Sequence, residues 1–139
     1  MLPVADVHTP QQRSRNMSAI RGKDTKPEMI VRRIAHRLGF RFRLHRRDLP
    51  GTPDVVFPKL RKIINIHGCY WHMHACRWGR VVPKTNAAFW HSKRTGNVVR
   101  DARNLRLLRR DGWKVLAIWE CQTGNIGVLR HRILRFLSA

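Results

Sequence analysis

Residues 49–68 read LPGTPDVVFPKLRKIINIHG, and this stretch decides the fold. Its first five residues combine proline with glycine, which is typical of a tight turn. Asp54 then opens a short apolar run over residues 55–57, and a charged turn leads to a second run over residues 63–66 that ends at Gly68. Short apolar runs bounded by turn residues are typical of strands. Antiparallel pairing of the two strands would bring the end of the second one close to Asp54.

Helical patterns lie on both sides of these strands. Thr25 and Glu28 have the spacing of a capping box, and apolar residues then recur at helical spacing until Gly39. The other elements that we predict are a strand over 40–44, a helix over 97–110, a strand over 113–119 that is apolar enough to be buried on both faces, and a final helix over 125–137. The order α-β-β-β-α-β-α predicts an α/β fold, a single domain with a mixed β-sheet flanked by helices.

Two segments have no clear period. Residues 1–20 are polar and basic, and we interpret them as a flexible N-terminal arm before a domain that spans residues 21–139. For residues 1–10, a terminus without a function is nearly as good an interpretation. Residues 69–90 are rich in aromatic, histidine and cysteine residues, and we interpret them as an irregular insertion.

The charge of the chain points to its partner. Lysine and arginine together number 29 against 8 acidic residues, which gives a formal net charge of +21 in 139 residues. Such an imbalance favours a polyanionic partner, and nucleic acid is the natural one. No apolar run approaches the roughly 20 residues that span a bilayer, and residues 1–20 lack the apolar core of a signal peptide. We therefore expect a cytoplasmic protein with no membrane partner.

The three cysteines and a cluster of histidines have the spacing of a metal site. Cys69, His74 and Cys76 fall within eight residues, and Cys121 follows the last predicted strand. Three thiolates and an imidazole suit structural zinc, which would order the insertion. His67 and His72 lie close enough in the sequence to leave the identity of the histidine ligand open. The alternative is three free cysteines beside histidines that cluster by chance.

Asp54 is the candidate catalytic carboxylate. A nuclease needs an oxygen ligand that holds Mg²⁺ against the scissile phosphate, and the carbonyl of Ile66 could supply a second one. His67 and His72 could accept a proton from water or face the phosphate, although His72 could instead support a zinc ligand.

Two further acidic residues have a functional and a structural interpretation. Asp101 could fix the orientation of a histidine or form an ion pair with an arginine of its own helix. Glu28 could orient the same site, but the capping box is the safer interpretation.

Aromatic residues are interleaved with basic ones at both ends of the insertion. Tyr70, Trp71 and Trp90 could stack on bases or wedge between base pairs, and packing around zinc would use the same residue types. Trp113 and Trp119, in the buried strand, are expected in the core.

Five motifs follow one another along the chain: LPGTPD at 49–54, HGCYWHMHAC at 67–76, FW at 89–90, NVVRD at 97–101 and GWKVLAIWEC at 112–121. Together they resemble the very short patch repair endonucleases, and the similarity runs from about residue 13 to residue 121. The resemblance implies a restriction-endonuclease-like fold. It also implies an enzyme that nicks double-stranded DNA beside the T of a T·G mismatch made by deamination of 5-methylcytosine.

The resemblance also implies a role for individual residues. Asp54 would bind magnesium together with the Ile66 carbonyl, and His72 would be the general base, oriented by Asp101 and assisted by His67 and Glu28. The zinc ligands would be Cys69, His74, Cys76 and Cys121, and the intercalating residues would be Tyr70, Trp71 and Trp90. The N-terminal arm would embrace the duplex. The enzyme is expected to be a monomer, with other mismatch-repair proteins as candidate partners.

The sequence departs from the wider nuclease superfamily in one strand. An acid and a lysine are expected there, and residues 63–67 carry neither, which fits the mismatch-nicking branch, where histidine takes over. Ile66 stands where threonine is common. Two alternatives remain at this point: a non-catalytic zinc-containing DNA-binding module, and an RNA-binding protein of the ribosomal or nucleoid type, which would need no zinc.

Overall fold

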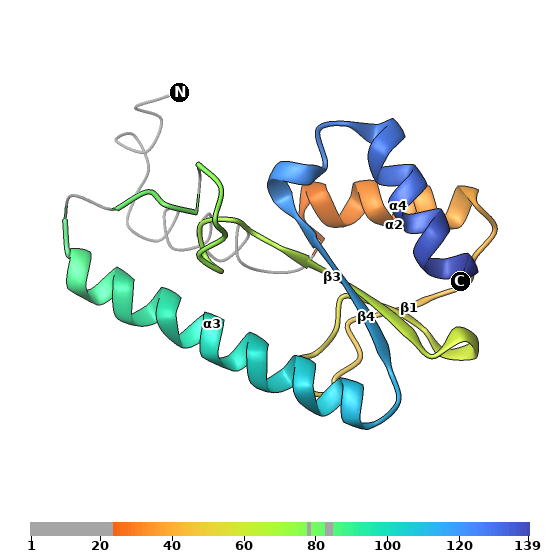
Figure 1. Ribbon diagram of the computed structural model, residues 1–139, viewed down its shortest axis with the longest axis horizontal. Helices are drawn as coiled ribbons and strands as arrows, with labels where there is room; N and C mark the ends of the chain where they lie inside the picture. The colour runs from red at the N-terminus through yellow and green to blue at the C-terminus, as the bar shows by residue number, and fades with distance from the viewer. Residues whose placement is uncertain (1–23, 78, 83–84) are drawn as a thin grey trace.

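The computed structural model describes residues 24–77, 79–82 and 85–139, so the predicted N-terminal arm lies outside the described residues (Figure 1). The elements are α2 (Lys26–Arg37), β1 (Arg43–Leu44), β2 (Val55–Phe57), β3 (Lys62–His67), α3 (Ala87–Arg110), β4 (Lys114–Trp119) and α4 (Ile126–Ser138), with 3-10 turns at Pro58–Leu60 and Glu120–Gln122. The predicted order of helices and strands is confirmed.

The four strands form one mixed sheet in the order β1-β2-β3-β4. The first three strands are antiparallel neighbours, and β4 lies parallel to β3. Val55 pairs with Ile64, which places the residue before β2 opposite the end of β3. Parallel neighbours need a long crossover, and the insertion and α3 provide it here.

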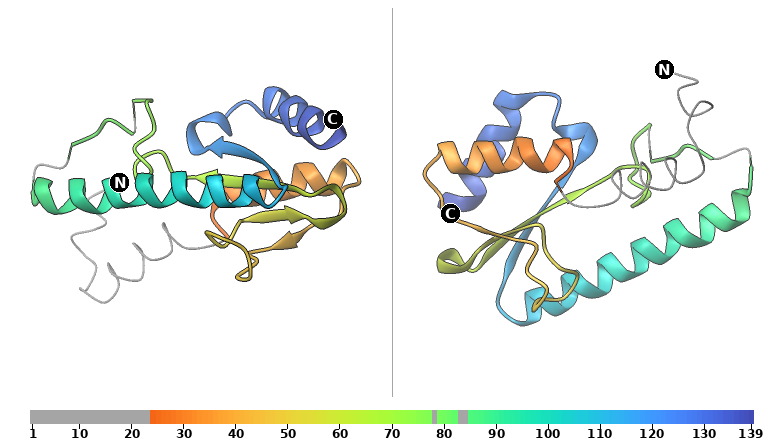
Figure 2. Two further views of the ribbon diagram at one scale, coloured as in Figure 1. Left: turned by 60° about the horizontal axis from the view of Figure 1, so that its bottom comes forward. Right: turned by 180° about the vertical axis from the view of Figure 1, so that it is seen from behind.

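Helices cover the sheet on both faces. Helices α2 and α4 lie on one side of the strands and α3 lies on the other (Figures 1 and 2). The α2/α4 side holds the larger buried cluster, made of Val31, Ile34, Ala35, Val55, Phe57, Ile64, Ile118, Leu129, Ile133 and Leu137. The α3 side holds Val56, Ile63, Leu108 and Trp113. Neighbouring residues of β2 and β3 alternate between the two clusters, as the pleat of a strand requires.

Helix α3 begins ten residues earlier than predicted, at Ala87 instead of residue 97. The apolar period starts late because only the C-terminal part of the helix packs in the core: Leu108 is buried, whereas Val98 is 40% exposed. Trp90 therefore lies on a helix and not in the irregular insertion. In the described part of the chain, no helix is long and apolar enough to cross a membrane.

The prediction that β4 is buried on both faces was wrong. The strand forms one edge of the sheet, and of its residues only Ile118 is fully buried. Trp119 is half-buried, so the prediction that it belongs to the core was also wrong, although Trp113 is a core residue. Ile118 and Leu116 pack in the larger cluster, whereas Val115, Ala117 and Trp119 line the cleft described below.

The capping box at the start of α2 is only half formed. The Thr25 side chain accepts the Glu28 N–H at 3.4 Å, as predicted. The Glu28 carboxylate does not return this bond to Thr25 but accepts the N–H of Asp24, one residue further away, at 3.1 Å. The carboxylate is therefore positioned by more than the cap.

Candidate active site

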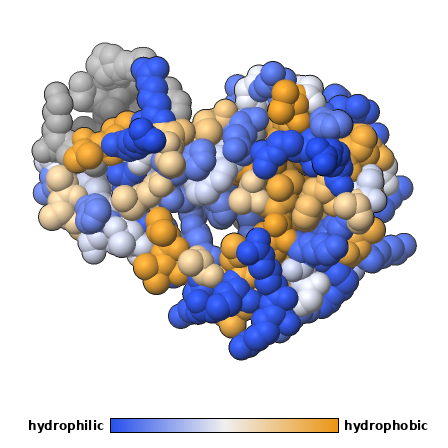
Figure 3. Space-filling view, in the orientation of Figure 1, coloured by the Kyte–Doolittle hydropathy of each residue, from blue (hydrophilic) through white to orange (hydrophobic). Residues whose placement is uncertain are grey.

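A cleft of about 960 Å³ lies between the sheet, the start of α2 and the middle of α3. It is lined by all six residues predicted to serve catalysis or magnesium binding: Glu28, Asp54, Ile66, His67, His72 and Asp101. Hydrophilic side chains cover much of the face seen in Figure 3. The fold thus brings together residues that are up to 73 positions apart in the sequence (Glu28 to Asp101).

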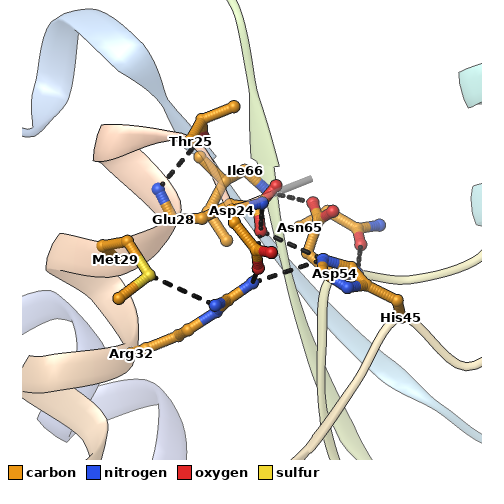
Figure 4. A network of polar contacts seen from close by, with 9 residues as sticks. All are labelled: Asp24, Thr25, Glu28, Met29, Arg32, His45, Asp54, Asn65 and Ile66. Atoms are coloured by element: carbon orange, nitrogen blue, oxygen red, sulfur yellow. Dashed lines mark hydrogen bonds and ion pairs between the residues drawn. The ribbon is translucent and has the colours of Figure 1, made fainter. Parts of the chain in front are cut away.

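Asp54 is held by backbone contacts at the start of β2 (Figure 4). Its carboxylate oxygen Oδ2 accepts the Ile66 N–H at 2.8 Å, and its own N–H donates to Asn65 Oδ1 at 3.2 Å. The predicted closeness of Asp54 to the end of β3 is confirmed. The other carboxylate oxygen, Oδ1, accepts no hydrogen bond from any described residue, and it is therefore available to a cation or to water.

Burial raises the pKa of Asp54 to about 6. The Ile66 N–H opposes this rise, and the nearby charge of Glu28 adds to it. The Asp54 carboxylate is therefore costly to ionise, because it is buried and lies beside a second carboxylate. A bound divalent cation would offset this cost.

The turn before Asp54 is fixed against α3. Gly51 adopts a φ of +78°, and a Cβ at this position would come within 2.8 Å of Asn104 Nδ2. Only glycine allows both the left-handed backbone and this close approach. The turn that carries Asp54 therefore lies directly against the helix that carries Asp101.

His72 and Asp101 form a hydrogen-bonded pair across the cleft, between His72 Nδ1 and Asp101 Oδ2. A carboxylate is only an acceptor, so Nδ1 carries the proton and Nε2 is the free base in neutral imidazole. Of the two interpretations of Asp101, the structure shows the contact with a histidine. The pair has the geometry of a base held in one tautomer by an acid.

His67 lies beside His72, with 4.4 Å between the ring centroids, and 4.9 Å from the ring of Trp119. Burial and, to a smaller extent, the charge of His72 lower the pKa of His67 to about 4, against the opposing effect of Asp101. His67 is therefore neutral at physiological pH in this state. It can accept or relay a hydrogen bond but carries no charge.

The four predicted zinc ligands converge at the ends of β3 and β4. The sulfur atoms of Cys69, Cys76 and Cys121 and one ring nitrogen of His74 all lie within 4.8 Å of one another. Tetrahedral ligands about 2.3 Å from zinc are roughly 3.8 Å apart, so the group is compact enough to share one ion. Of the three candidate histidines, His74 belongs to this group, and His67 and His72 do not.

Neighbouring residues hold the cysteine group in place. Burial raises the pKa of the Cys69 thiol to about 12, and a bound cation would offset this cost of ionisation. The ring of His74 stacks on Trp119 with centroids 4.1 Å apart. Gly79 packs against the backbone of His74 so closely that a Cβ would lie 1.8 Å from its carbonyl oxygen.

The predicted intercalating residues form one aromatic cluster near the cleft. Trp71 lies 5.0 Å from Tyr70 and 5.6 Å from Trp90, measured between ring centroids. Trp71 is only 8% exposed, whereas Tyr70 and Trp90 are half-buried. Tyr70 and Trp71 line the cleft.

Arg94 is a buried arginine with a structural role. It is 4% exposed and donates to the carbonyls of Tyr70, Gly79 and Val81 at 2.7, 2.5 and 2.8 Å. Its guanidinium also lies 4.1 Å from the centroid of the Tyr70 ring. Arg94 thus ties the insertion to α3, next to the cysteine group.

The lysine of β3 has a structural contact far from the cleft. Lys62 is buried, and its ammonium donates to the carbonyls of Phe136 and Ala139, both at 2.6 Å. Burial lowers its pKa. Lys62 therefore has a structural role, and residues 63–67 of the same strand contain no lysine that could serve catalysis.

Sequence reasoning missed three residues of the site: Arg32, His45 and Asn65. Asn65 interrupts an apolar run between Ile64 and Ile66, and that break was a usable signal. Arg32 and His45 gave no signal, because only the fold brings them to Glu28.

Asp54 and the His72–Asp101 pair share one cleft with the basic residues Lys93 and Arg100, an arrangement that suits an enzyme that cleaves DNA. The comparisons with known proteins agree. The family model "DNA mismatch endonuclease Vsr" matches residues 5–78, and the chain belongs to this family of DNA endonucleases. The resemblance found from the motifs is confirmed, and the interpretation as a non-catalytic binding module is not supported.

Three relatives illustrate the similarity. The chain is 42% identical over 135 residues to the type II nicking enzyme V.XorIIP of Xanthomonas oryzae pv. oryzae, covering 97% of this chain and 98% of the relative. It is 39% identical over 134 residues to the type II nicking enzyme V.NmeAIP of Neisseria meningitidis, covering 96% and 95%. It is 42% identical over 118 residues to the DNA mismatch endonuclease Vsr of Escherichia coli K12, covering 85% and 75%.

Proposed function

We propose that this protein is a magnesium-dependent endonuclease that nicks one strand of duplex DNA beside the T of a T·G mismatch. Such mismatches arise when 5-methylcytosine is deaminated, and the nick would start very short patch repair in the cytoplasm, at the bacterial nucleoid. The names of the relatives support both a mismatch substrate and nicking. The observation that carries the proposal is Asp54, whose free oxygen faces a cleft shared with the His72–Asp101 pair.

Asp54 and the carbonyl of Ile66 would hold Mg²⁺. In an extended strand the N–H and the C=O of one residue point toward the same neighbouring strand. The Ile66 N–H donates to Asp54, so its carbonyl is directed to the same side. The oxygen donors suit magnesium, which supplies Lewis-acid stabilisation of charge on the phosphate when it is bound. Because only the backbone of Ile66 is used, the loss of the common threonine is tolerated.

His72 would act as the general base. Nε2 of its ring would take a proton from the water as that water attacks phosphorus and the P–O bond to the leaving sugar oxygen breaks, with the leaving oxygen taking a proton from solvent. The Asp101 carboxylate would hold Nδ1–H and stabilise the imidazolium that forms. His67, neutral and in contact with His72, would relay hydrogen bonds. Glu28 would assist from the opposite side of the cleft.

Cys69, His74, Cys76 and Cys121 would bind zinc in a structural role, since the donor set leaves no position open for a reacting water. Tyr70, Trp71 and Trp90 would intercalate beside the mismatch, and the N-terminal arm would contact the duplex. The mixed sheet between helices fits a restriction-endonuclease-like fold. We propose a monomer, which other mismatch-repair proteins assist.

The test is cleavage of end-labelled duplexes that contain one T·G pair or one T·A pair, in Mg²⁺ or in chelator, read on a denaturing gel. The unmodified protein should nick only the T·G duplex, in one strand and only with Mg²⁺. Asp54→Ala should lower the rate by on the order of 10³-fold or more, because the carboxylate ligand is lost. Its affinity for the duplex should stay the same or increase.

The matched control is Asp48→Ala. Asp48 is also acidic, but it is exposed and paired with Arg46 at a distance of 2.5 Å. This variant should nick as the unmodified protein does. If Asp54→Ala nicked the T·G duplex at the unmodified rate, the proposed metal site would be wrong. If both duplexes were nicked equally, the mismatch specificity would be wrong.

A further inference from the structure

Glu28 is held in place by an arginine and a histidine from two different segments (Figure 4). Its side chain is buried, with the residue 3% exposed. Oxygen Oε2 accepts from Arg32 Nη2 at 2.7 Å and contacts His45 Nε2 at 3.0 Å. The same arginine nitrogen lies 2.7 Å from Oδ1 of Asp24.

All of these contacts fall on one oxygen of the Glu28 carboxylate. The second oxygen, Oε1, has no hydrogen-bond partner within the described residues, and Glu28 lines the cleft. Asp54 has the same asymmetry, with Oδ2 bonded to the Ile66 N–H and Oδ1 without a described partner. The two carboxylates are close enough for the charge of Glu28 to act on Asp54. Each therefore presents one unused oxygen to the same cleft.

His45 links the Glu28 carboxylate to the backbone of Asp54. Its backbone N–H donates to the Asp54 backbone carbonyl oxygen at 3.1 Å, and its side chain contacts Glu28. It follows β1 immediately and adopts a φ of +46°. A shift of His45 would therefore move Asp54 and Glu28 relative to each other.

Arg32 supplies the positive charge for this group. Donor atoms of Asp24, Glu28 and His45 lie within 4.8 Å of one another, which is a spacing that a cation could use. Arg32 Nη2 lies 2.7 Å from both carboxylates and 3.4 Å from His45 Nε2. The guanidinium thus occupies the place of a second cation and compensates the charge of Glu28.

We propose that Arg32 and His45 are positioning residues of the magnesium site, which hold Glu28 so that its free oxygen binds a water of the cation carried by Asp54. Neither residue touches the cation or the DNA. Both act through Glu28, and His45 also acts through the Asp54 backbone. The inference rests on the proposed function, because it needs a cation at Asp54.

The experiment measures Mn²⁺ binding to zinc-loaded protein by electron paramagnetic resonance, together with the Mg²⁺ concentration that gives half-maximal nicking. Loss of an outer contact of a metal ligand typically weakens metal binding by about 10–100-fold. We expect this weakening in Arg32→Ala and in His45→Ala. The Mg²⁺ concentration that gives half-maximal nicking should rise by a similar factor.

Rescue variants separate positioning from simple loss of structure. The amide nitrogen of glutamine can donate where Nε2 of His45 does, so His45→Gln should restore most of the Mn²⁺ affinity. Arg32→Lys keeps the charge and should restore part of it. Both variants should unfold at a denaturant concentration close to that of the unmodified protein.

The matched control is Arg33→Ala, which removes the same charge from the neighbouring, exposed position of α2. Equal weakening in Arg33→Ala and Arg32→Ala would overturn the proposal, because net charge alone would then explain it. Failure of His45→Gln to bind better than His45→Ala would also overturn it. Asp54→Asn distinguishes a failure of the proposed function from a failure of this inference. If Asp54→Asn binds Mn²⁺ normally, the proposed function fails. If it loses Mn²⁺ while the Arg32 and His45 variants bind normally, only this inference fails.

Discussion

The cysteine group and the site at Asp54 differ in how many protein ligands each offers to a metal ion. Four protein donors, from Cys69, His74, Cys76 and Cys121, surround one point at the ends of β3 and β4. At Asp54, a single carboxylate oxygen is free, beside one backbone carbonyl and an open cleft. A filled set of ligands holds an ion for the fold, whereas a partly filled set leaves room for water and substrate.

We expect the largest effect when one ligand of the cysteine group is removed. Cys121 is exposed, and substitution of an exposed side chain usually changes the free energy of unfolding by less than about 0.5 kcal/mol. We predict that Cys121→Ser lowers this free energy by on the order of 5 kcal/mol, because zinc binding is coupled to folding. Chemical denaturation followed by circular dichroism measures the change.

The control for this prediction is the unmodified protein after its zinc has been removed by a chelator. It should be as unstable as Cys121→Ser, and the chelator should not destabilise the variant further. Asp54→Asn should keep its zinc, measured by elemental analysis. A stable Cys121→Ser variant that retains one zinc per chain would contradict the assignment of the fourth ligand.

The second prediction concerns the His72–Asp101 pair in the cleft. Asp101→Asn removes the acceptor of the His72 Nδ1–H, and we expect nicking to slow by about 10²–10⁴-fold, the usual contribution of an oriented general base. Affinity for the T·G duplex should be unchanged. Single-turnover nicking and a binding titration measure the two effects.

Asp111→Asn provides the comparison for Asp101→Asn, because Asp111 is an exposed acid at the end of the same helix. It should nick at the unmodified rate. If Asp101→Asn were equally active, the His72–Asp101 pair would be a structural contact.

The smallest expected effect is on the pH dependence of stability without Mg²⁺. Asp54 has a pKa of about 6 in the folded chain against an ordinary 3.8, so between these values the folded state binds more protons than the unfolded state. Its contribution to stability therefore falls as the pH rises from about 4 to about 6, by at most about 3 kcal/mol. For His67 the folded pKa is lower, about 4 against 6.5, and its contribution rises with pH.

Paired measurements separate these two slopes from other titrating groups, including the zinc ligands. With increasing pH, the unmodified protein should lose stability relative to Asp54→Asn and gain stability relative to His67→Gln. Urea unfolding at several pH values between 4 and 6.5 provides both differences. Slopes of the same sign in the two comparisons would contradict the burial of these groups.

Much of the fold followed from local patterns in the sequence. The residues 55–57 and 63–66 form the central strands because they are apolar runs bounded by turn residues, and the turn at 49–54 places Asp54 opposite the end of β3. The site residues were predicted mainly from motifs, and the structure gathers all six of them in one cleft. The predicted zinc ligands converge because β3 and β4 are parallel neighbours and end together.

The rest depended on contacts between distant segments, which periodicity does not report. Helix α3 begins at Ala87, where no apolar stripe starts, and the Arg94 guanidinium in this part of the helix binds carbonyls of the insertion. Trp119 looked like a core residue, but its ring faces His67 and His74 at the edge of the sheet. The roles of Arg32 and His45 arise from a carboxylate in another segment.

Helix α3 also connects two distant parts of the molecule. Leu108 is packed in the core, and Trp90 lies on the same helix 18 residues away, which corresponds to about 27 Å. A tilt of about 5° at Leu108 would therefore displace Trp90 by roughly 2 Å, from the helical rise alone. Packing beneath the last turn of the helix thus affects the position of the Trp90 ring at its other end.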